Sequence, residues 1–270
     1  LTAEGLQRLQ TLLIKAGSVQ GLGLAGLRAD RMPVLPGGIA IMSAVFEELG
    51  IEHMTYADGA LRLGVLYDLL GRVHHLDMRD ATVDQFMRRY QVDARQAERI
   101  ERTAGHILLQ LLGKPQTPDQ ESDFQFLSWA AKLHEIGISV AHNGYHKHGA
   151  YILTFADMPG FSKKDQARLA LLVFGHRGKL EKITALPTGD PHWKLLCALR
   201  LATLFHRSRD GVSLPPFRLR ALADGFLLEL QNDWLAMHPL TAVALSEEIA
   251  AWQRVGQVLS VKHRNLERDA

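Results

Sequence analysis

Apolar positions in the first quarter of the chain fall into short helical runs separated by glycines. Their spacing predicts an amphipathic helix that ends at Gly17, a glycine-rich loop over residues 19–26 and a second helix that ends at Gly50. A short strand from His53 to Ala57 should follow, with a further helix after the turn at Asp58. This opening section therefore mixes helix, strand and loop.

From residue 71 to residue 209 the pattern is almost purely helical. Three helix starts are predicted by pairs of residues that can form a capping box or a related cap: Thr82 with Gln85, Asp93 with Gln96, and Ser162 with Asp165. The last helix of this section should run from Trp193 to Phe205. We expect five or six helices packed together here.

The pattern changes again after residue 209. Two runs, Phe217 to Leu222 and Phe226 to Leu230, flank a glycine turn and predict a β-hairpin. A closing helix should begin at Pro239 and carry Leu240, Val243 and Trp252. The polar tail from Lys262 is expected to fray.

Length and composition fit a soluble, globular protein of two domains. The chain has 270 residues, 47% of them hydrophobic, and no uninterrupted apolar run near the roughly 18 residues of a membrane span. The single cysteine, Cys197, excludes an internal disulfide framework and makes a reducing cytoplasm the expected location. The formal net charge is only +2, so any anion site must come from local clustering of basic residues.

The segment Leu133 to Gly137 contains His134-Glu135, which resembles the central pair of the HD metal-dependent phosphohydrolases. In that family, adjacent His and Asp residues ligate a divalent ion that activates water. Two further ligand positions hold Gln96 and Thr203 here, so the ligand set is degenerate and we expect no metal at His134 and Glu135. His134 also continues an apolar helix face, which favours a histidine in the core or at a helix end.

Basic side chains are concentrated between Tyr145 and Lys182. Several of them stand at predicted helix starts, where free N–H groups and cationic side chains favour phosphate. A single lysine is more simply a solvated residue, but the concentration predicts an anionic partner. Protonation of the histidines near pH 6.5 should strengthen its binding. The candidates for contact are His146, Lys147, His148, Lys163 and Arg177.

A third group of candidates lies near the N-terminus. Gly37 and Gly38 open the second predicted helix, and paired glycines permit close approach of a phosphate to backbone N–H groups. By itself, such a pair more often marks a simple turn. The basic residues around it are Arg28, Arg31 and Arg62.

Taken together, these segments resemble the Ppx/GppA family of exopolyphosphatases and guanosine pentaphosphate phosphatases. The resemblance is carried by Asp30-Arg31 with Leu35 to Ile41, Asp58 to Arg62 with Gly64 to Asp68, Leu133 to Gly137, His146 to Tyr151, Pro159 to Ser162, and His176-Arg177. Two departures stand out: Leu63 replaces the usual Glu, and Gly178 follows the His-Arg pair.

The resemblance implies a fold of the α+β class, predominantly α, in three parts. Residues 1–71 would be the end of an actin-like, ribonuclease-H-type domain. Residues 72–209 would form an HD-like helical domain, and residues 210–270 a β-hairpin and closing helix packed on it. The family's catalytic glutamate and first phosphate loop lie in an N-terminal domain, so we expect no catalytic residue in this chain. On this interpretation, Leu1 marks a cut within a longer polypeptide.

The resemblance also implies a function. Such enzymes remove terminal phosphates from polyphosphate, or the γ-phosphate from guanosine pentaphosphate, with Mg²⁺ in the actin-like cleft, and related enzymes are dimers. We therefore expect part of an exopolyphosphatase, in which this chain binds and guides the polyanion and mediates dimerisation. Arg28, Arg31 and Arg62 would act near the cleft, and the later cations along the helical domain.

Three alternatives remain open. One is a guanosine pentaphosphate phosphohydrolase, and another is a self-sufficient metal phosphohydrolase that uses His134 and Glu135. The third is a non-catalytic module that binds nucleic acid or a protein. Nucleic acid has little support, because the basic clusters contain few aromatic residues for base stacking. We expect neither nucleic acid nor a membrane as a partner.

Overall fold

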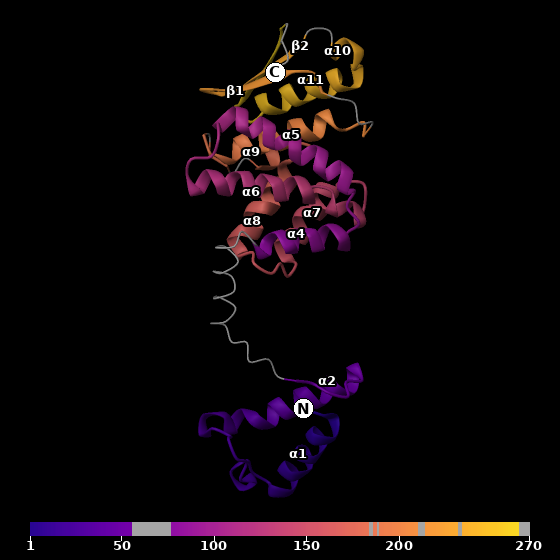
Figure 1. Ribbon diagram of the computed structural model, residues 1–270, viewed down its shortest axis with the longest axis vertical. Coiled ribbons are helices and arrows are strands. Elements are labelled where there is room, and N and C mark those ends of the chain that lie inside the picture. Colours follow the sequence, from indigo (N-terminus) through magenta and orange to yellow (C-terminus); the bar gives the residue numbers. More distant parts are fainter. Residues whose placement is uncertain (56–76, 184–185, 188, 210–213, 232–233, 265–270) are drawn as a thin grey trace. The chain divides into compact units, whose positions relative to one another are not determined.

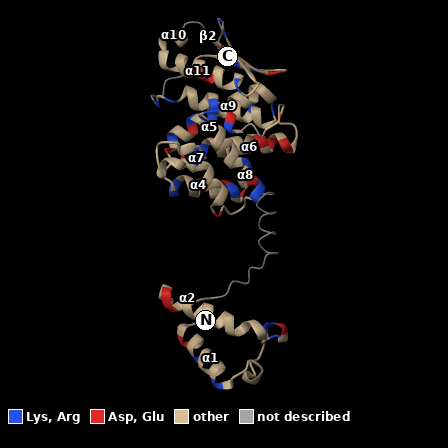
Figure 2. Cartoon of the chain, turned by 180° about the vertical axis from the view of Figure 1, so that it is seen from behind, with Lys and Arg blue, Asp and Glu red and all other residues tan. Residues whose placement is uncertain are grey.

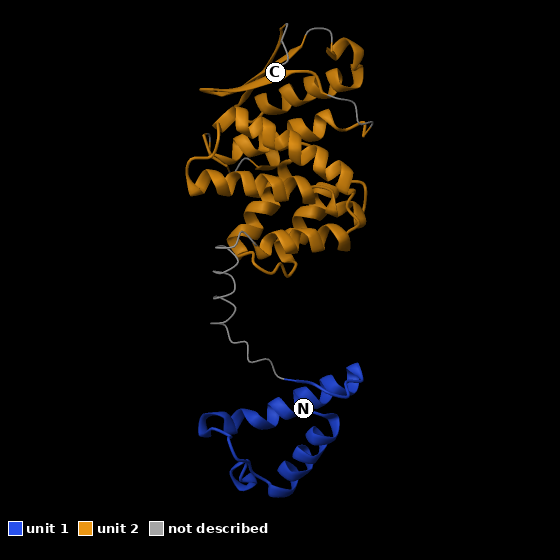
Figure 3. Ribbon diagram, viewed as in Figure 1, with its two compact units in different colours: residues 1–67 blue, residues 68–270 orange. Residues whose placement is uncertain are grey.

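The computed structural model describes residues 1–55, 77–183, 186–187, 189–209, 214–231 and 234–264 (Figure 1). The chain divides into two compact units, residues 1–67 (unit 1) and residues 68–270 (unit 2), which are coloured separately in Figure 3. It is mostly helical with one small sheet, so the fold is α+β and predominantly α, as predicted. The predicted boundary at residue 71 lies outside the described residues.

Unit 1 is built around two α-helices that pack on each other. These are α1 (Ala3–Ala16) and α2 (Leu35–Leu49), with the short 3-10 segments η1 (Gln20–Leu22) and η2 (Ala29–Val34) between them. Gly17 and Gly50 end the two helices in left-handed conformations, which confirms both predicted stops. The predicted strand at His53 is reduced to one bridge with Thr2, and Ala57 lies outside the described residues.

The second helix of unit 1 leaves most of its apolar surface exposed. By length and composition alone, Ala29–Leu49 could cross a membrane, although the sequence suggested no such run. Its α-helical part begins only at Leu35 and has 15 residues, about 22 Å at 1.5 Å per residue. That is shorter than the roughly 30 Å of a hydrocarbon core. This length favours a helix with an apolar face over a membrane span.

Six α-helices form the body of unit 2 in the range that the structure describes, which confirms the expected five or six. They are α4 (Met78–Arg89), α5 (Ala94–Leu112), α6 (Pro118–Leu133), α7 (Tyr145–Phe155), α8 (Lys163–Gly175) and α9 (His192–Phe205). The short 3-10 segments η3 (Ile136–Ser139) and η4 (Leu180–Ile183) follow α6 and α8. Because α9 is apolar around most of its circumference, it is buried in contact with α5, α6 and α8.

Two of the three predicted helix starts are confirmed. Asp93 accepts the N–H groups of two residues at the start of α5, and Ser162 with Asp165 forms a complete capping box on α8. The third prediction is wrong, because Asp77 caps α4 and the helix begins at Met78. Thr82 therefore lies inside α4, where its hydroxyl donates to the Pro159 carbonyl oxygen at 2.7 Å.

The C-terminal section adds a three-stranded sheet and a helix to the same core. The strands are β1 (Phe217–Leu222), β2 (Gly225–Gln231) and β3 (Val258–Arg264), and the helices are α10 (Trp234–Met237) and α11 (Pro239–Gln253). β1 and β2 form the predicted antiparallel hairpin, and β3 pairs with β2 in parallel. Side chains from β1, β2, β3 and α11 join those of the helices in one hydrophobic cluster.

The closing helix is confirmed, and the prediction for the tail is wrong only at its start. The tail does not fray over residues 262–264, because they complete β3 beside Glu229, whose buried carboxylate pairs with Arg220 and Arg264. Residues 265–270 lie outside the described residues. Pro239 does begin α11, but Leu240 is 86% exposed. The helix packs instead through a face that ends in the fully buried Trp252.

Candidate anion-binding site

The HD-like pair lies at the end of α6, where it is held by protein groups. His134 is 1% exposed, and its Nδ1 lies 2.6 Å from the Ala131 carbonyl oxygen. A carbonyl can only accept, so Nδ1 carries the proton and Nε2 faces Glu135, 3.7 Å from its Oε1. Burial lowers the pKa of His134, which favours the neutral imidazole. The structure thus places His134 at a buried helix end.

The other positions of the degenerate ligand set have protein partners as well. Glu135 pairs with Arg209 at 2.5 Å, and the Gln96 side-chain amide donates to the His206 carbonyl oxygen at 2.8 Å. The Thr203 hydroxyl donates to a carbonyl within its own helix. Across the described ranges, no group of three or more His, Cys, Asp and Glu side chains is arranged to hold a metal. The donor set therefore does not fit the alternative of a metal centre at His134 and Glu135.

The N-terminal candidates lie in unit 1, on and before α2. Gly37 and Gly38 are in the first turn of α2 rather than in a simple turn, and nothing lies within 4 Å of a Cβ added at either position. Arg28 makes an exposed bidentate pair with Asp30, at 3.1 Å for both contacts. Arg31 is exposed at the end of η2. Arg62 lies outside the described residues.

In unit 2, the structure brings part of the predicted basic region together. His146 and Lys147 from α7 meet Arg177 from the loop after α8, with Lys182 from η4 beside them. The Lys182 ammonium group donates to the Arg177 carbonyl oxygen at 2.5 Å. Gly178 lies between His146 and Lys182 with a φ of 73°, a conformation that strains other residues. This explains the departure after the His-Arg pair.

The positive charges of this group repel one another. The pKa of His146 is lowered to about 4, first by burial and then by the positive charges of Lys182, Arg177, Lys147 and Arg200. Burial also lowers the pKa of Lys182 to about 7, with the help of its cationic neighbours. A bound anion would relieve this repulsion. His146 does not titrate near pH 6.5, so the expected strengthening of anion binding at that pH is wrong for this residue.

Two predicted residues do not join the group. Lys163 begins α8 and Arg177 follows its end, and 13 helical residues at 1.5 Å each separate the two by about 20 Å. His148 lies two positions after His146 on α7, which turns it about 200° around the helix axis. Neither residue can share a small ligand with the group. Figure 2 shows basic and acidic residues dispersed along the ribbon of unit 2, so the group is a local feature.

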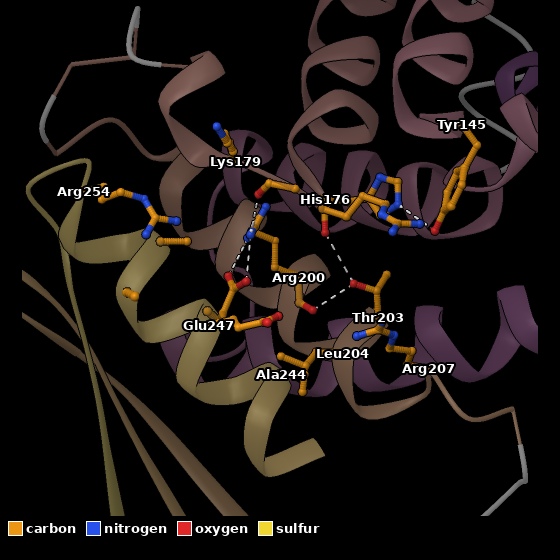
Figure 4. Close-up of a pocket in the computed structure, with 15 residues that line it drawn as sticks. Tyr145, His176, Lys179, Arg200, Thr203, Leu204, Arg207, Ala244, Glu247 and Arg254 are labelled. Atoms are coloured by element: carbon orange, nitrogen blue, oxygen red, sulfur yellow. Dashed lines mark hydrogen bonds and ion pairs between the residues drawn. The ribbon is translucent and has the colours of Figure 1, made fainter. Parts of the chain in front are cut away.

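A cavity of about 530 Å³ opens beside these cations (Figure 4). Its walls come from the start of α7, the loop after α8, α9 and α11. His176 at its edge is buried, with Nδ1 at 2.6 Å from the Val173 carbonyl oxygen and Nε2 at 3.5 Å from the Tyr145 hydroxyl. Burial keeps the pKa of His176 well below its ordinary value, so this wall residue is neutral.

Arg200 ties the walls of the cavity together. Its guanidinium donates to both carboxylate oxygens of Glu248 on α11, at 2.5 and 2.7 Å. It also donates to the carbonyl oxygens of Gly175 and Gly178, at 2.7 and 3.0 Å. Trp252 donates to the same Glu248 carboxylate at 2.7 Å. The loop that carries Arg177 is therefore fixed to both α9 and α11.

The predicted site residues did not include Arg200 or several other charged residues of the cavity, among them Arg207, Glu247 and Arg254. Arg200 did give a signal, because it interrupts a leucine-rich run and a buried arginine requires partners. Arg207, Glu247 and Arg254 are exposed side chains in or just after α9 and α11. Nothing in the linear pattern links α11 to the end of α8, because that contact is tertiary.

Comparison with known proteins assigns both units to one class. Residues 78–249 match the family model described as Ppx/GppA phosphatase, domain III, and residues 1–73 match that of the Ppx/GppA phosphatase family. The helical unit is thus a Ppx/GppA domain III. The chain belongs to the Ppx/GppA phosphatase family, which confirms the resemblance noted in the sequence.

Individual relatives carry one name, guanosine-5′-triphosphate,3′-diphosphate pyrophosphatase. The protein of Aeromonas hydrophila is 38% identical over 95% of this chain, and that of Pseudoalteromonas translucida is 36% identical over 97%. A Vibrio cholerae protein is 33% identical over 97%. The chain covers 52% or 53% of these proteins, so it spans about half the length of the relatives it matches.

Proposed function

We propose that this chain is part of a hydrolase that removes phosphate from guanosine 5′-triphosphate 3′-diphosphate. The observation that carries the proposal is the identity of 33–38% to relatives of that name, over 95–97% of the chain. The similarity therefore includes the helical unit and its cavity as well as unit 1. These names favour the nucleotide as the substrate. The main expectation from the sequence was inorganic polyphosphate.

The cationic group of unit 2 supports an anionic substrate of this kind. Lys182, Arg177 and Lys147 lie close enough to add to the effect of burial on the pKa of His146, and a polyphosphorylated ligand would neutralise them. In unit 1, the first turn of α2 is open above Gly37 and Gly38, so a phosphate could approach its N–H groups. The two units thus offer basic or N–H-rich surfaces suited to phosphate.

The ion and the catalytic glutamate of the proposed enzyme are also part of the proposal. Mg²⁺ needs several oxygen ligands, mostly carboxylates, and the described residues hold no group of three or more acidic or histidine side chains suited to it. We propose that the ion and the catalytic glutamate belong to the part of the relatives' length that this chain does not cover. The homodimer and the cytoplasmic location stay predictions.

A chimera tests the proposal. This chain would replace the half that it matches in the Aeromonas hydrophila protein, and phosphate release would be measured with the nucleotide and with inorganic pentapolyphosphate. We expect the chimera to favour the nucleotide by about tenfold or more in kcat/KM, and this chain alone to release negligible phosphate. A preference for pentapolyphosphate, or rapid turnover by the isolated chain, would contradict the proposal.

A further inference from the structure

Strand β1 forms one edge of the small sheet of unit 2, because the strand order is β1-β2-β3. Its hairpin with β2 pairs Leu222 with Gly225 across a turn of two residues. In such a hairpin the two residues that flank the turn exchange both of their hydrogen bonds, and this exchange recurs at every second pair. The backbone N–H and C=O groups of Leu219 and Ala221 therefore point away from β2, toward the edge.

A side chain of α5 already occupies the first part of this edge. Gln110 accepts a hydrogen bond from the Leu219 N–H at 2.5 Å and donates one to the Phe217 carbonyl oxygen at 3.3 Å. Its amide thus takes the place of one peptide unit of a neighbouring strand. The Gln110 amide nitrogen also lies 2.7 Å from Nε2 of His106, which fixes the amide in position. These contacts agree with the outward direction of the backbone groups in β1.

The second part of the edge is open. Ala221 is exposed, and its N–H and C=O groups have no hydrogen-bond partner among the residues that the structure describes. The same holds for the Leu219 carbonyl oxygen. An open strand edge is a template on which another extended segment can pair through its backbone. Because both groups of Ala221 are open, one opposing residue can exchange two hydrogen bonds with it, which is the antiparallel pattern.

Arginine side chains beside the edge select the kind of segment that can pair there. Side chains of a strand alternate between its faces, and Leu219 is buried, so Arg218 and Arg220 lie on the outer face. The Arg220 guanidinium contacts the Glu229 carboxylate at 2.5 Å and is still 56% exposed. A second copy of β1 would bring arginines of both strands together, and like charges opposite one another destabilise a sheet. An acidic strand would instead pair with them.

The outer face of the sheet carries more positive than negative charge in the described strands. Lys262 of β3 lies opposite Glu229 of β2, and Arg264 contacts the same carboxylate at 3.0 Å. Together with Arg220, these residues place three cations around one carboxylate. Charge complementarity therefore favours an acidic segment over a neutral or basic one.

We propose that the open part of the β1 edge binds an extended, acidic segment of a partner protein, which adds to the sheet as an antiparallel strand. Leu219 and Ala221 supply the backbone hydrogen bonds, and Arg220 pairs with an acidic side chain opposite it. Gln110 sets the limit of the added strand. This interaction surface does not depend on the substrate of the proposed hydrolase, so it stands or falls by its own test.

NMR titration of the 270-residue chain tests the proposal. The probe is a capped hexapeptide of alternating glutamate and valine. One comparison peptide has lysine in place of glutamate, and the other has N-methylated valines, which lack the N–H groups that face β1. We expect the glutamate peptide to bind at least about tenfold more tightly than either comparison peptide. The amide of Ala221 should also become protected from hydrogen exchange in the complex.

Substitutions locate the binding on the edge. Ala221→Pro removes an N–H group that β2 does not use, so it should weaken binding of the glutamate peptide by about fivefold or more. Arg220→Gln leaves Glu229 paired with Arg264 and should reduce the preference for glutamate over lysine by about fivefold or more. The matched control is Lys262→Gln on the same face, two strands from the edge, and it should change the preference by less than about twofold.

Removal of the Gln110 side chain should have the opposite effect. Gln110→Ala frees the Phe217 carbonyl oxygen and the Leu219 N–H for pairing. A capped octapeptide of the same alternating sequence should therefore bind this variant about threefold or more tightly than the wild type. A purely electrostatic contact would not respond to this change, so equal or weaker binding would overturn the proposal.

The peptides also test the proposal on the unaltered chain, in case Ala221→Pro does not fold. Equal binding of the glutamate peptide and its N-methylated form by the wild type would show that backbone pairing contributes nothing, and would overturn the proposal. An Ala221 amide that stays unprotected in the saturated complex, or a preference for glutamate that survives Arg220→Gln, would do the same. No binding of the glutamate peptide at millimolar concentration would remove the site.

Discussion

Unit 1 and unit 2 differ most in how far they bury their apolar side chains. In the described part of unit 1, only Leu6, Ile39 and Phe46 are buried, while Ile14 and Leu49 are 73% and 71% exposed. Unit 2 buries one continuous cluster drawn from every α-helix between α4 and α9, as well as from α11 and the sheet. Folding free energy should therefore reside mainly in unit 2.

The same contrast holds for ion pairs. Arg28 and Asp30 of unit 1 make a bidentate contact with side chains 79% and 56% exposed, whereas Arg200 and Glu248 of unit 2 are 3% and 10% exposed. An exposed pair is worth little, because water solvates its members equally well. A buried pair is costly to break, because the remaining charge has no solvent. Removing one member of an arginine–carboxylate pair should therefore cost more free energy of unfolding in unit 2 than in unit 1.

The largest expected difference is in hydrogen exchange. Amides in α6 and α9 should exchange only through global unfolding of unit 2, whereas those in α1 and α2 should exchange through local opening. With a global stability of about 5–15 kcal/mol for a domain of this kind, protection should differ by roughly 10⁴-fold or more. Exchange followed by mass spectrometry on the 270-residue chain measures this. Equal protection of the backbone amides in α2 and α9 would contradict the predicted difference between the two units.

The next largest effect concerns the two ion pairs. Arg200→Met should destabilise unit 2 by about 3–5 kcal/mol, because Glu248 is left buried without its partner. Arg28→Met should change stability by less than about 0.5 kcal/mol. All four tryptophans lie in unit 2, so urea unfolding followed by their fluorescence reports the first value, and hydrogen exchange in η2 and α2 reports the second.

The double variant Arg200→Met with Glu248→Met is the control for this prediction. It should recover much of the loss, because replacing both members of a buried pair by apolar groups is often nearly neutral. A loss of under 1 kcal/mol in the single variant would show that the pair is more solvated than its exposure indicates.

Much of the fold follows from local patterns. The helix stops at Gly17 and Gly50, the caps at Asp93 and Ser162, and the hairpin are all set by residues adjacent in sequence, so the sequence predicts them. β3 was not predicted, because it pairs with β2 only through tertiary structure. The polar residues at the end of β3 resemble those of a frayed terminus.

The candidate site was less predictable. His146, Lys147 and Arg177 belong to basic stretches of sequence and lie together in the structure, whereas Lys163 lies apart from them. Their role in binding stays a prediction. The predicted helix start at Ser162 was correct, and the length of α8 accounts for the separation of Lys163 from Arg177. The α11 side of the cavity, with Glu247, is likewise brought to α9 only by packing.

Glycine substitutions provide a third comparison. A Cβ added at Gly137 in unit 2 would lie 2.0 Å from the Tyr145 carbonyl oxygen, so the backbone must shift. Gly137→Ala should therefore destabilise unit 2 by about 3 kcal/mol. Gly38 in unit 1 is helical and open, so Gly38→Ala should stabilise α2 by up to about 1 kcal/mol. Tryptophan fluorescence in urea and hydrogen exchange measure the two effects.

In the chimera, Gly38→Ala has a second readout. Slower exchange in α2 combined with weaker binding of the nucleotide would support close approach of a phosphate to this turn. Unchanged nucleotide turnover would remove Gly38 from the binding surface and leave the stability comparison intact.

The smallest expected effect is the response to acid, which should be confined to unit 2. Folding lowers the pKa of His146 from 6.5 to about 4, mainly through burial, so the folded state binds fewer protons than the unfolded state in this window. Its contribution to stability is complete above pH 6.5 and is lost as the pH falls toward 4. His134 and His176 are shifted in the same direction, so His146→Gln is needed to isolate one residue.

Urea unfolding of the wild type and of His146→Gln between pH 7.5 and 4 measures that contribution. The wild type should lose more stability than the variant over this range, and hydrogen exchange in α1 and α2 should show no matching change. Pentapolyphosphate should raise the pKa of His146 in an NMR titration, because a bound anion offsets the cations around the ring. A His146 resonance that titrates near pH 6.5 without any anion would show that Lys182 and Arg177 do not enclose it as the structure indicates.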